Sequence, residues 1–229
     1  MEGPAIAATA LFRLGPVPVS DTVVTTWGLM LFLFLFCWLA TRRLRIQPVP
    51  CQVVLEGIVL TIQDAIDAVL PDNGSRILPF VGTLWIFLSM ANLIGILPGL
   101  RGPTADLSTT AALALLVFLS VHWYGIRIYG LRRYLRHYLK PSPVLLPFHI
   151  ISELSRTVAL AVRLFGNIFS LEMAALLILL VAGFLVPIPV LILHVIEALV
   201  QAYIFGMLAL IYIAGGIQSL EAKSITQKE

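Results

Sequence analysis

Four ionisable residues lie inside the otherwise apolar C-terminal third of the chain: Arg163, Glu172, His194 and Glu197. An arginine inside a membrane costs roughly a few to more than 10 kcal/mol, so it usually faces protein or water and has a function. Carboxylates and an imidazole exchange protons, whereas a guanidinium keeps its proton at attainable pH. A group of ionisable residues inside an apolar segment therefore indicates a functional site.

The spacing of the polar residues places them on facing stripes if the region folds as an antiparallel helical hairpin. Asn167 is four residues after Arg163 and shares its face, and Glu172 lies about half a turn round the same helix. The second stripe, at positions i, i+3 and i+7, consists of His194, Glu197 and Gln201. A hairpin would bring this stripe beside Asn167 and Glu172 and form a polar lane through an apolar body.

The composition of the whole chain is that of a membrane protein. Of its 229 residues, 59% are hydrophobic and 12% are charged, and the mean hydropathy is +0.98. A soluble domain carries about twice that fraction of charge. Apolar runs at 23–40, 78–97 and 106–126 are each long enough to span a bilayer. We expect Asp106 to cap the third of these helices, because aspartate at a helix start accepts hydrogen bonds from unpaired backbone N–H groups.

Two further segments differ from these spans. Residues 51–70 carry three acids on one polar arc, which indicates an amphipathic helix lying in the membrane interface. Residues 148–186 are predicted to form one helix, with a tight turn at 187–189 and a second helix over 190–214 before a short polar tail. At about 1.5 Å per residue the first helix would be about 60 Å long, twice the hydrocarbon thickness, so it must tilt, bend or project from the bilayer.

We therefore expect an all-α integral membrane protein with about three upright spanning helices, an interfacial amphipathic helix and a long, steeply tilted C-terminal helical hairpin. The expected regions are an N-terminal lead-in with the first transmembrane helix (1–50), the amphipathic helix (51–76), the second and third transmembrane helices with a basic loop (77–147), and the hairpin with its tail (148–229).

The basic residues predict an orientation. If the chain crosses the membrane at each predicted span in turn, only Arg13 and Arg101 lie on one side of the membrane. Arg156 and Arg163 lie inside the long helix. The other side receives the remaining eleven, which are Arg42, Arg43, Arg45, Arg76, Arg127, Arg132, Arg133, Arg136, Lys140, Lys223 and Lys228. Because basic loops stay in the cytoplasm, the N-terminus is expected outside and the C-terminus in the cytoplasm. No signal peptide is recognisable, so we expect the first span to direct insertion, most simply into a bacterial plasma membrane.

A family resemblance rests on several motifs within residues 52–216. They are Asn92-Leu-Ile-Gly-Ile-Leu-Pro-Gly99, Pro103-Thr-Ala-Asp106, Glu153-Leu-Ser-Arg156, Arg163-Leu-Phe-Gly-Asn167 and Gln201-Ala-Tyr-Ile-Phe205. Together they resemble subunit a of F-type ATP synthases, and the pairing of the last two at this separation is specific. That family often has proline where Thr157 stands and serine where Ala159 stands, and neither difference alters a charge.

The resemblance implies a role in ion translocation in the membrane Fo sector. The hairpin would pack against a ring of c subunits, with Arg163 as the essential cation between two offset half-channels. The outer half-channel would contain Glu172, His194, Asn167, Gln201 and Glu197, and the inner one Glu153; the fit of Glu197 to the family pattern is open. Protons are the default ion. Expected partners are the c-ring, b-type peripheral stalk subunits, the lipid bilayer and, indirectly, the F1 sector.

Plainer interpretations stay open at this point. Arg163 could pair with an acid only to hold helices together, and Glu172 and His194 could form ordinary hydrogen bonds between helices. The same applies to Asn167 and Gln201. Glu153 and Glu197 are as readily structural as functional, and His122 and His137 are expected at the interface rather than in the pathway.

Other classes of protein are less consistent with the sequence. An independent secondary ion transporter would show internal repeats and broken helices, and none is recognisable. A structural scaffold would not need Arg163, Glu172 and His194 in one hairpin. Without a GxxxxGK[ST] loop the chain is not expected to hydrolyse ATP or to be an enzyme. Cys37 and Cys51 lack metal-site spacing, and no metal, cofactor or nucleic-acid partner is expected.

Overall fold

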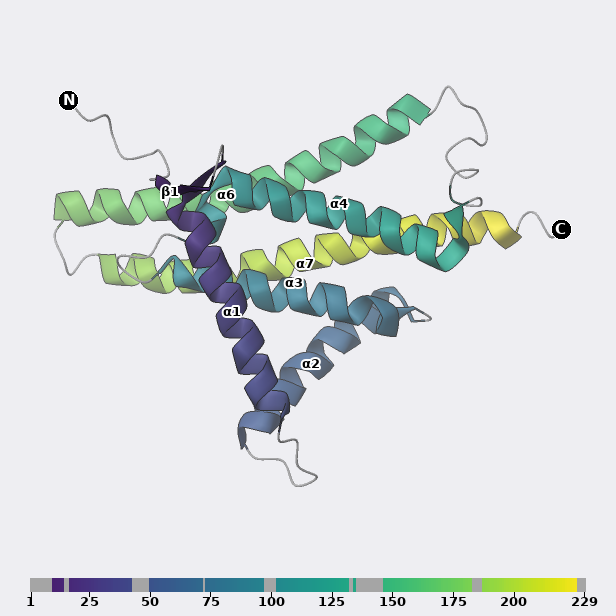
Figure 1. The fold of residues 1–229 in the computed structure, drawn as a ribbon, viewed down its shortest axis with the longest axis horizontal. Coiled ribbons are helices and arrows are strands. Elements are labelled where there is room, and N and C mark those ends of the chain that lie inside the picture. Colours follow the sequence, from purple (N-terminus) through teal and green to yellow (C-terminus); the bar gives the residue numbers. More distant parts are fainter. Residues whose placement is uncertain are drawn as a thin grey trace.

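The fold is a bundle of long helices preceded by a short β-hairpin (Figure 1). The computed structural model describes residues 10–14, 17–42, 50–71, 73–96, 102–131, 134, 146–182 and 187–225. The elements are β1 (Ala10–Leu14), β2 (Val17–Ser20), α1 (Asp21–Thr41), α2 (Pro50–Val69), α3 (Gly74–Ile94), the 3₁₀ turn η1 (Pro103–Ala105), α4 (Leu107–Tyr129), α6 (Leu146–Ala182) and α7 (Pro187–Ile225).

Five of these helices, α1, α3, α4, α6 and α7, are long and apolar enough to cross a membrane. The expected first, second and third spans correspond to α1, α3 and α4. The helix α2 is not among the five, and it carries Glu56, Asp64 and Asp67. One face of α2 packs inward, where Ile62 and Ile66 are buried against α3 and α7. The tilt of each helix relative to a bilayer remains a prediction.

The N-terminal hairpin was not anticipated, since residues 1–20 were expected to be an irregular lead-in. Strands β1 and β2 pair antiparallel, with Phe12 opposite Val19 and Leu14 opposite Val17. Two residues of turn-forming type, Gly15-Pro16, stand between the strands, and the β-branched valines favour an extended backbone. The helical class is therefore confirmed for the spans, and a two-stranded element must be added to it.

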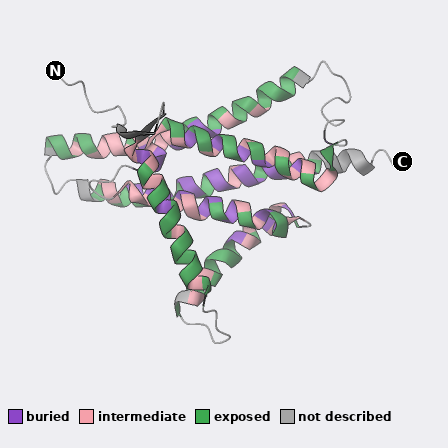
Figure 2. Cartoon of the chain, viewed as in Figure 1, coloured by how far each residue is buried: buried purple, intermediate pink, exposed green. Residues whose placement is uncertain are grey.

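The centre of the bundle is the contact between α3, α4, α6 and α7. Side chains from all four helices share one buried cluster, which includes Leu88 of α3, Val117 of α4, Leu164 of α6 and Phe205 of α7. Small residues at the contacts let the helices approach closely, as is usual in membrane bundles. Figure 2 shows this buried centre, and it shows α1 and both ends of α6 as largely exposed.

One close approach involves Gly206 of α7 and Trp85 of α3. The Trp85 indole lies where a Cβ at position 206 would be, so only glycine fits there without a shift. The indole Nε1–H donates to the Tyr203 carbonyl oxygen at 3.1 Å, and the Trp85 and Tyr203 rings stack at 5.7 Å. This contact sets the spacing of α3 and α7.

The ends of the long helices differ from prediction in two places. Pro187 and Pro189 do not form a tight turn but belong to the first turn of α7, where a missing N–H is harmless. Residues 183–186, which precede them, lie outside the described residues. The helix also continues past the expected end at Ala214, because Ile217 is buried and Gly216 lets α7 approach Val121 of α4.

The predicted single long helix is confirmed as α6, with 37 residues. At about 1.5 Å per residue it is about 55 Å long, which exceeds the thickness of a hydrocarbon core. Figure 1 shows that its first part runs obliquely while its second part runs alongside the other helices. The C-terminal ends of α4 and α7 and the beginning of α6 all lie toward the right-hand end in the same view, with the beginning of α6 directed away from the other two.

Candidate functional site

Arg163 lies in the middle of α6 on the side that faces away from the bundle core. Its neighbours Leu160 and Leu164 are buried, whereas Arg163 and Val162 are exposed. Among the described residues, the guanidinium forms no hydrogen bond and no ion pair. Within the described part of the chain, Arg163 is thus a cation without a counter-charge on a largely apolar outer surface, where a group on another molecule can reach it.

A hydrogen bond between side chains joins α6 and α7 one turn beyond this arginine. Asn167 Nδ2 donates to Gln201 Oε1 at 2.8 Å. Gln201 is only 1% exposed, and its Nε2 group has no partner within the described ranges. The predicted meeting of the two polar stripes is thus observed for this pair.

Two more polar side chains are buried next to this part of α7. His194 is 2% exposed, and its Nε2 atom has no hydrogen-bond partner in the described part of the chain. Asn92 of α3 is fully buried and donates through Nδ2 to the Ala198 carbonyl oxygen at 3.1 Å, while its Oδ1 atom has no such partner. Each unpaired buried group costs about 1–3 kcal/mol, so their clustering is typical of a functional region.

Glu172 and Glu197, the other predicted members of this group, are both half-buried. Glu172 lies nine residues beyond Arg163 on α6, and Glu197 lies between His194 and Gln201 in the α7 sequence. Neither carboxylate takes part in the hydrogen bond from Asn167 to Gln201. The structure therefore places both acids on the expected helices without joining them to that hydrogen bond.

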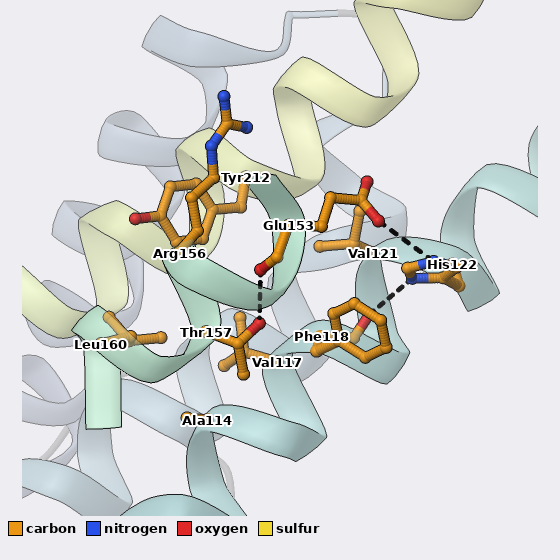
Figure 3. A pocket seen from close by; sticks show the side chains of 10 residues that line it. All are labelled: Ala114, Val117, Phe118, Val121, His122, Glu153, Arg156, Thr157, Leu160 and Tyr212. Carbon is orange, nitrogen blue, oxygen red and sulfur yellow. Dashed lines mark hydrogen bonds and ion pairs between the residues drawn. The ribbon is translucent and has the colours of Figure 1, made fainter. Parts of the chain in front are cut away.

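Glu153, the predicted inner residue, lies near the beginning of α6 and contacts His122 of α4 (Figure 3). Glu153 Oε2 and His122 Nε2 are 3.4 Å apart, and the two side chains are 27% and 29% exposed. His122 Nδ1 lies 2.9 Å from the Phe118 carbonyl oxygen. Sequence reasoning left His122 out of the site, and His137, which was grouped with it, lies outside the described residues.

Asp106 fulfils its predicted role as the cap of α4. Its Oδ1 atom accepts from the Ser108 backbone N–H at 3.0 Å and from the Ser108 hydroxyl at 2.8 Å, and its Oδ2 atom accepts from the Thr22 hydroxyl at 2.9 Å. Burial alone would raise the pKa of this carboxyl, but these hydrogen bonds outweigh burial and hold the pKa below its usual value. The contact with Thr22 also ties the start of α1 to the start of α4.

Comparison with known proteins decides the family. Residues 23–214 match the model of the ATP synthase A chain. The chain belongs to the ATP synthase A chain family. It is 64% identical over 220 residues to ATP synthase subunit a 2 of Pelobacter propionicus, covering 96% of each chain. It is 61% identical over 214 residues to ATP synthase subunit a of Legionella pneumophila, covering 93% of each chain. It is also 61% identical over 221 residues to ATP synthase subunit a 1 of Hahella chejuensis, covering 96% of this chain and 94% of that one.

The ATP synthase A chain match extends from α1 to most of α7 and so includes every residue of the predicted site. The predicted family is thereby confirmed, and the five apolar helices fit a membrane protein of ion transport. Asn92 and His122 are the two site neighbours that the sequence did not reveal. Asn92 stood inside a recognised motif, which was a usable signal, whereas His122 stood in none of them.

Proposed function

We propose that this chain is subunit a of the membrane Fo sector of an F-type ATP synthase and that it provides two offset half-channels to the carboxylates of a c-ring. The observation that carries the proposal is the position of Arg163, an exposed cation on an apolar helix surface with no hydrogen bond or ion pair to the described residues. A charge in that setting needs a counter-charge from outside the chain, and a moving rotor carboxylate would supply it.

The order of residues along α6 supports two separate half-channels. Glu153, Arg163 and Glu172 follow one another at intervals of ten and nine residues, which correspond to about 15 Å each along the helix. Glu153 would serve the inner half-channel. Glu172 would serve the outer one, together with the residues that α7 and α6 contribute, namely His194, Glu197, Gln201 and Asn167. Arg163 then lies between the two.

In this mechanism a proton enters from outside, neutralises a rotor carboxylate, travels with the ring and leaves to the cytoplasm. The potential supplies about 2.3 kcal/mol per charge per 100 mV. Arg163 attracts the deprotonated carboxylate, which favours release of its proton, and separates the half-channels so that protons do not pass directly. Arginine suits this role because it keeps its proton and offers a rigid fork of donors, whereas a desolvated lysine loses its proton more easily.

The proposal includes partners and an orientation. The exposed side of α6 around Arg163 would face the c-ring, other apolar surfaces would face lipid and b-type stalk subunits, and the F1 sector would be reached indirectly. The subunit itself would not be catalytic. The distribution of basic residues supports an N-terminus outside and a C-terminus in the cytoplasm of a bacterial cell. No observation favours the alternative of an independent secondary ion transporter.

The decisive variants for this proposal are Arg163→Ala and Arg163→Lys in the assembled complex, in inside-out membrane vesicles. We expect both to abolish ATP-driven proton pumping, because neither provides a permanent guanidinium between the half-channels. Pumping is measured by quenching of a pH-sensitive dye. The matched control is Arg76→Ala, an exposed arginine in the first turn of α3 that has no part in the proposed pathway and that we expect to pump. Normal pumping by Arg163→Ala would overturn the proposal.

A further inference from the structure

The contact between His122 and Glu153 brings two titratable side chains from different helices together at one end of the bundle. Their facing atoms, Nε2 and Oε2, are 3.4 Å apart, and both side chains are partly exposed. Figure 3 shows the Glu153 carboxylate turned toward the imidazole ring across the contact between α4 and α6. About ten residues of helix, or about 15 Å, separate Glu153 from Arg163.

The neighbours of the imidazole determine how many protons lie between His122 Nε2 and Glu153 Oε2. His122 Nδ1 lies 2.9 Å from the Phe118 carbonyl oxygen, which can only accept a hydrogen bond, so Nδ1 carries a hydrogen. Nε2 then faces Glu153 Oε2, and two bare lone pairs would repel each other. The contact is attractive only when one proton lies between them, as an imidazolium with a carboxylate or an imidazole with a carboxylic acid.

Water can reach this proton. A cavity of about 30 Å³ is lined by His122, Glu153, Arg156, Thr157 and Tyr212, among others. That volume exceeds the roughly 10–15 Å³ that one water molecule requires, and the walls supply polar partners. A proton held by the pair is therefore able to exchange with water on the side from which the cavity opens.

Among the described residues, the charged or titratable groups near the pair include side chains of α6 and α7 and the phenol of Tyr134. Arg156 of α6 lies 5.8 Å over the ring of Tyr212 of α7, and Figure 3 shows its guanidinium pointing away from His122. Tyr134 packs edge-on to the imidazole with ring centres 5.9 Å apart. His149 is one turn before Glu153 on α6 and exposed.

We propose that His122 and Glu153 form a single-proton site of the inner half-channel, in which His122 is a positioning residue that keeps a proton on the pair at neutral pH. The proposal rests on the proposed function and adds His122 to it. During ATP-driven pumping, a proton from cytoplasmic water joins the pair and the proton already held leaves toward the rotor carboxylate. Each cycle returns the pair to the same charge, and no other bond changes.

Variants at position 122 test this through the pH profile of ATP-driven pumping. A carboxylate in water gives up its proton near pH 4.3, so we expect the site without the imidazole to take up a proton less readily as the pH rises. We expect His122→Gln to move the alkaline limb of the profile to lower pH by about one unit or more. Rates are normalised to the amount of subunit a in the vesicles, so altered assembly changes the amplitude but not the position of the limb.

The variant His122→Lys distinguishes a site that shares a proton from a contact that is purely structural. Lysine preserves an ion pair with Glu153 but holds its own proton up to about pH 10, so it cannot share one at neutral pH. The proposed site predicts that His122→Lys moves the limb at least as far as His122→Gln. A purely structural contact predicts that lysine restores the wild-type profile, and that result would overturn the proposal.

Two controls complete the design. Trp123→Phe changes the adjacent, 64% exposed residue of the same helix and is expected to leave the profile unchanged. Arg163→Ala, in the same vesicles, tests the proposed function independently. If it abolishes pumping while the His122→Gln profile superimposes on that of the wild type, the inference about His122 fails and the proposed function stands. If Arg163→Ala pumps normally, the proposed function fails, and this inference fails with it.

Discussion

At the scale of single residues, the site combines one exposed cation with several buried polar groups. Arg163 has no partner in the described part of its own chain, whereas Asn167 and Gln201, one turn away, are hydrogen-bonded to each other at 2.8 Å. This bond holds α6 and α7 in register beside the arginine. Because the Gln201 side chain is buried, loss of either partner leaves a polar group without its hydrogen bond, which costs about 1–3 kcal/mol.

A double-mutant cycle measures this coupling. We expect Asn167→Leu and Gln201→Leu each to lower the thermal midpoint of the purified subunit in detergent. The double variant should lose less free energy of unfolding than the sum of the two single losses, by about 0.5–3 kcal/mol. Thr61→Val serves as the control, because the Thr61 hydroxyl donates to the Gly57 carbonyl oxygen within its own helix, at the exposed surface of α2. Strict additivity of the two losses would contradict a direct role for the bond.

The residues of the site differ in how far the sequence could predict them. Asn167 and Gln201 were predictable because helical spacing and an antiparallel hairpin suffice to bring two stripes together. His122 was not, because its contact with Glu153 depends on the register of α4 against α6, and the residues between 134 and 146 give no periodic pattern from which to infer that register. The hydrogen bond that the Asn92 amide donates likewise depends on the position of Ala198 in another helix.

At the scale of elements, the centres of the helices were predictable and their ends were not. A span is determined by a long apolar run, which all five spans possess. The end of α7 was predicted at Ala214, before a short polar tail, whereas Gly216 meets Val121 of α4 and Ile217 is buried with α2 residues. Tertiary packing thus extended a helix that local preference alone would end.

The packing of α3 on α7 is testable at Gly206. We expect Gly206→Ala to destabilise the protein by about 1–3 kcal/mol, because the new methyl group displaces the Trp85 indole from its hydrogen bond to the Tyr203 carbonyl oxygen. A lower thermal midpoint and a change in tryptophan fluorescence would report this displacement. Gly215→Ala on the same helix has open space around its Cβ and should be neutral or stabilising by up to about 1 kcal/mol. Equal effects at the two glycines would refute this account of the contact.

At the scale of the whole molecule, exposure divides the bundle into an inner body and outer apolar surfaces. Figure 2 shows the buried residues concentrated where α3, α4, α6 and α7 meet. On α6, the residues before Arg163 lie partly on the outer surface and partly in the buried body: Ala159 is exposed, while Ala161 is 7% exposed. Composition predicted a membrane protein, but only the packing determines which side of α6 is outward, since leucine, valine and alanine occur on both.

In the proposed mechanism the outward side of α6 at Arg163 faces the rotor. Disulfide cross-linking in the assembled complex measures this directly. Ala159→Cys and Ala161→Cys are the same substitution two residues apart on opposite sides of the helix, made after Cys37 and Cys51 are replaced by serine. Each is paired with single cysteines along the c-subunit helix near its carboxylate, and oxidation yields are read from gels.

The account predicts that Ala159→Cys cross-links to c-subunit positions within about one turn of the carboxylate, because it shares the exposed face of Arg163. Ala161→Cys, which points into the bundle, should give no such product. Efficient cross-linking at position 161 with none at position 159 would show that Arg163 faces away from the rotor, and would contradict the account.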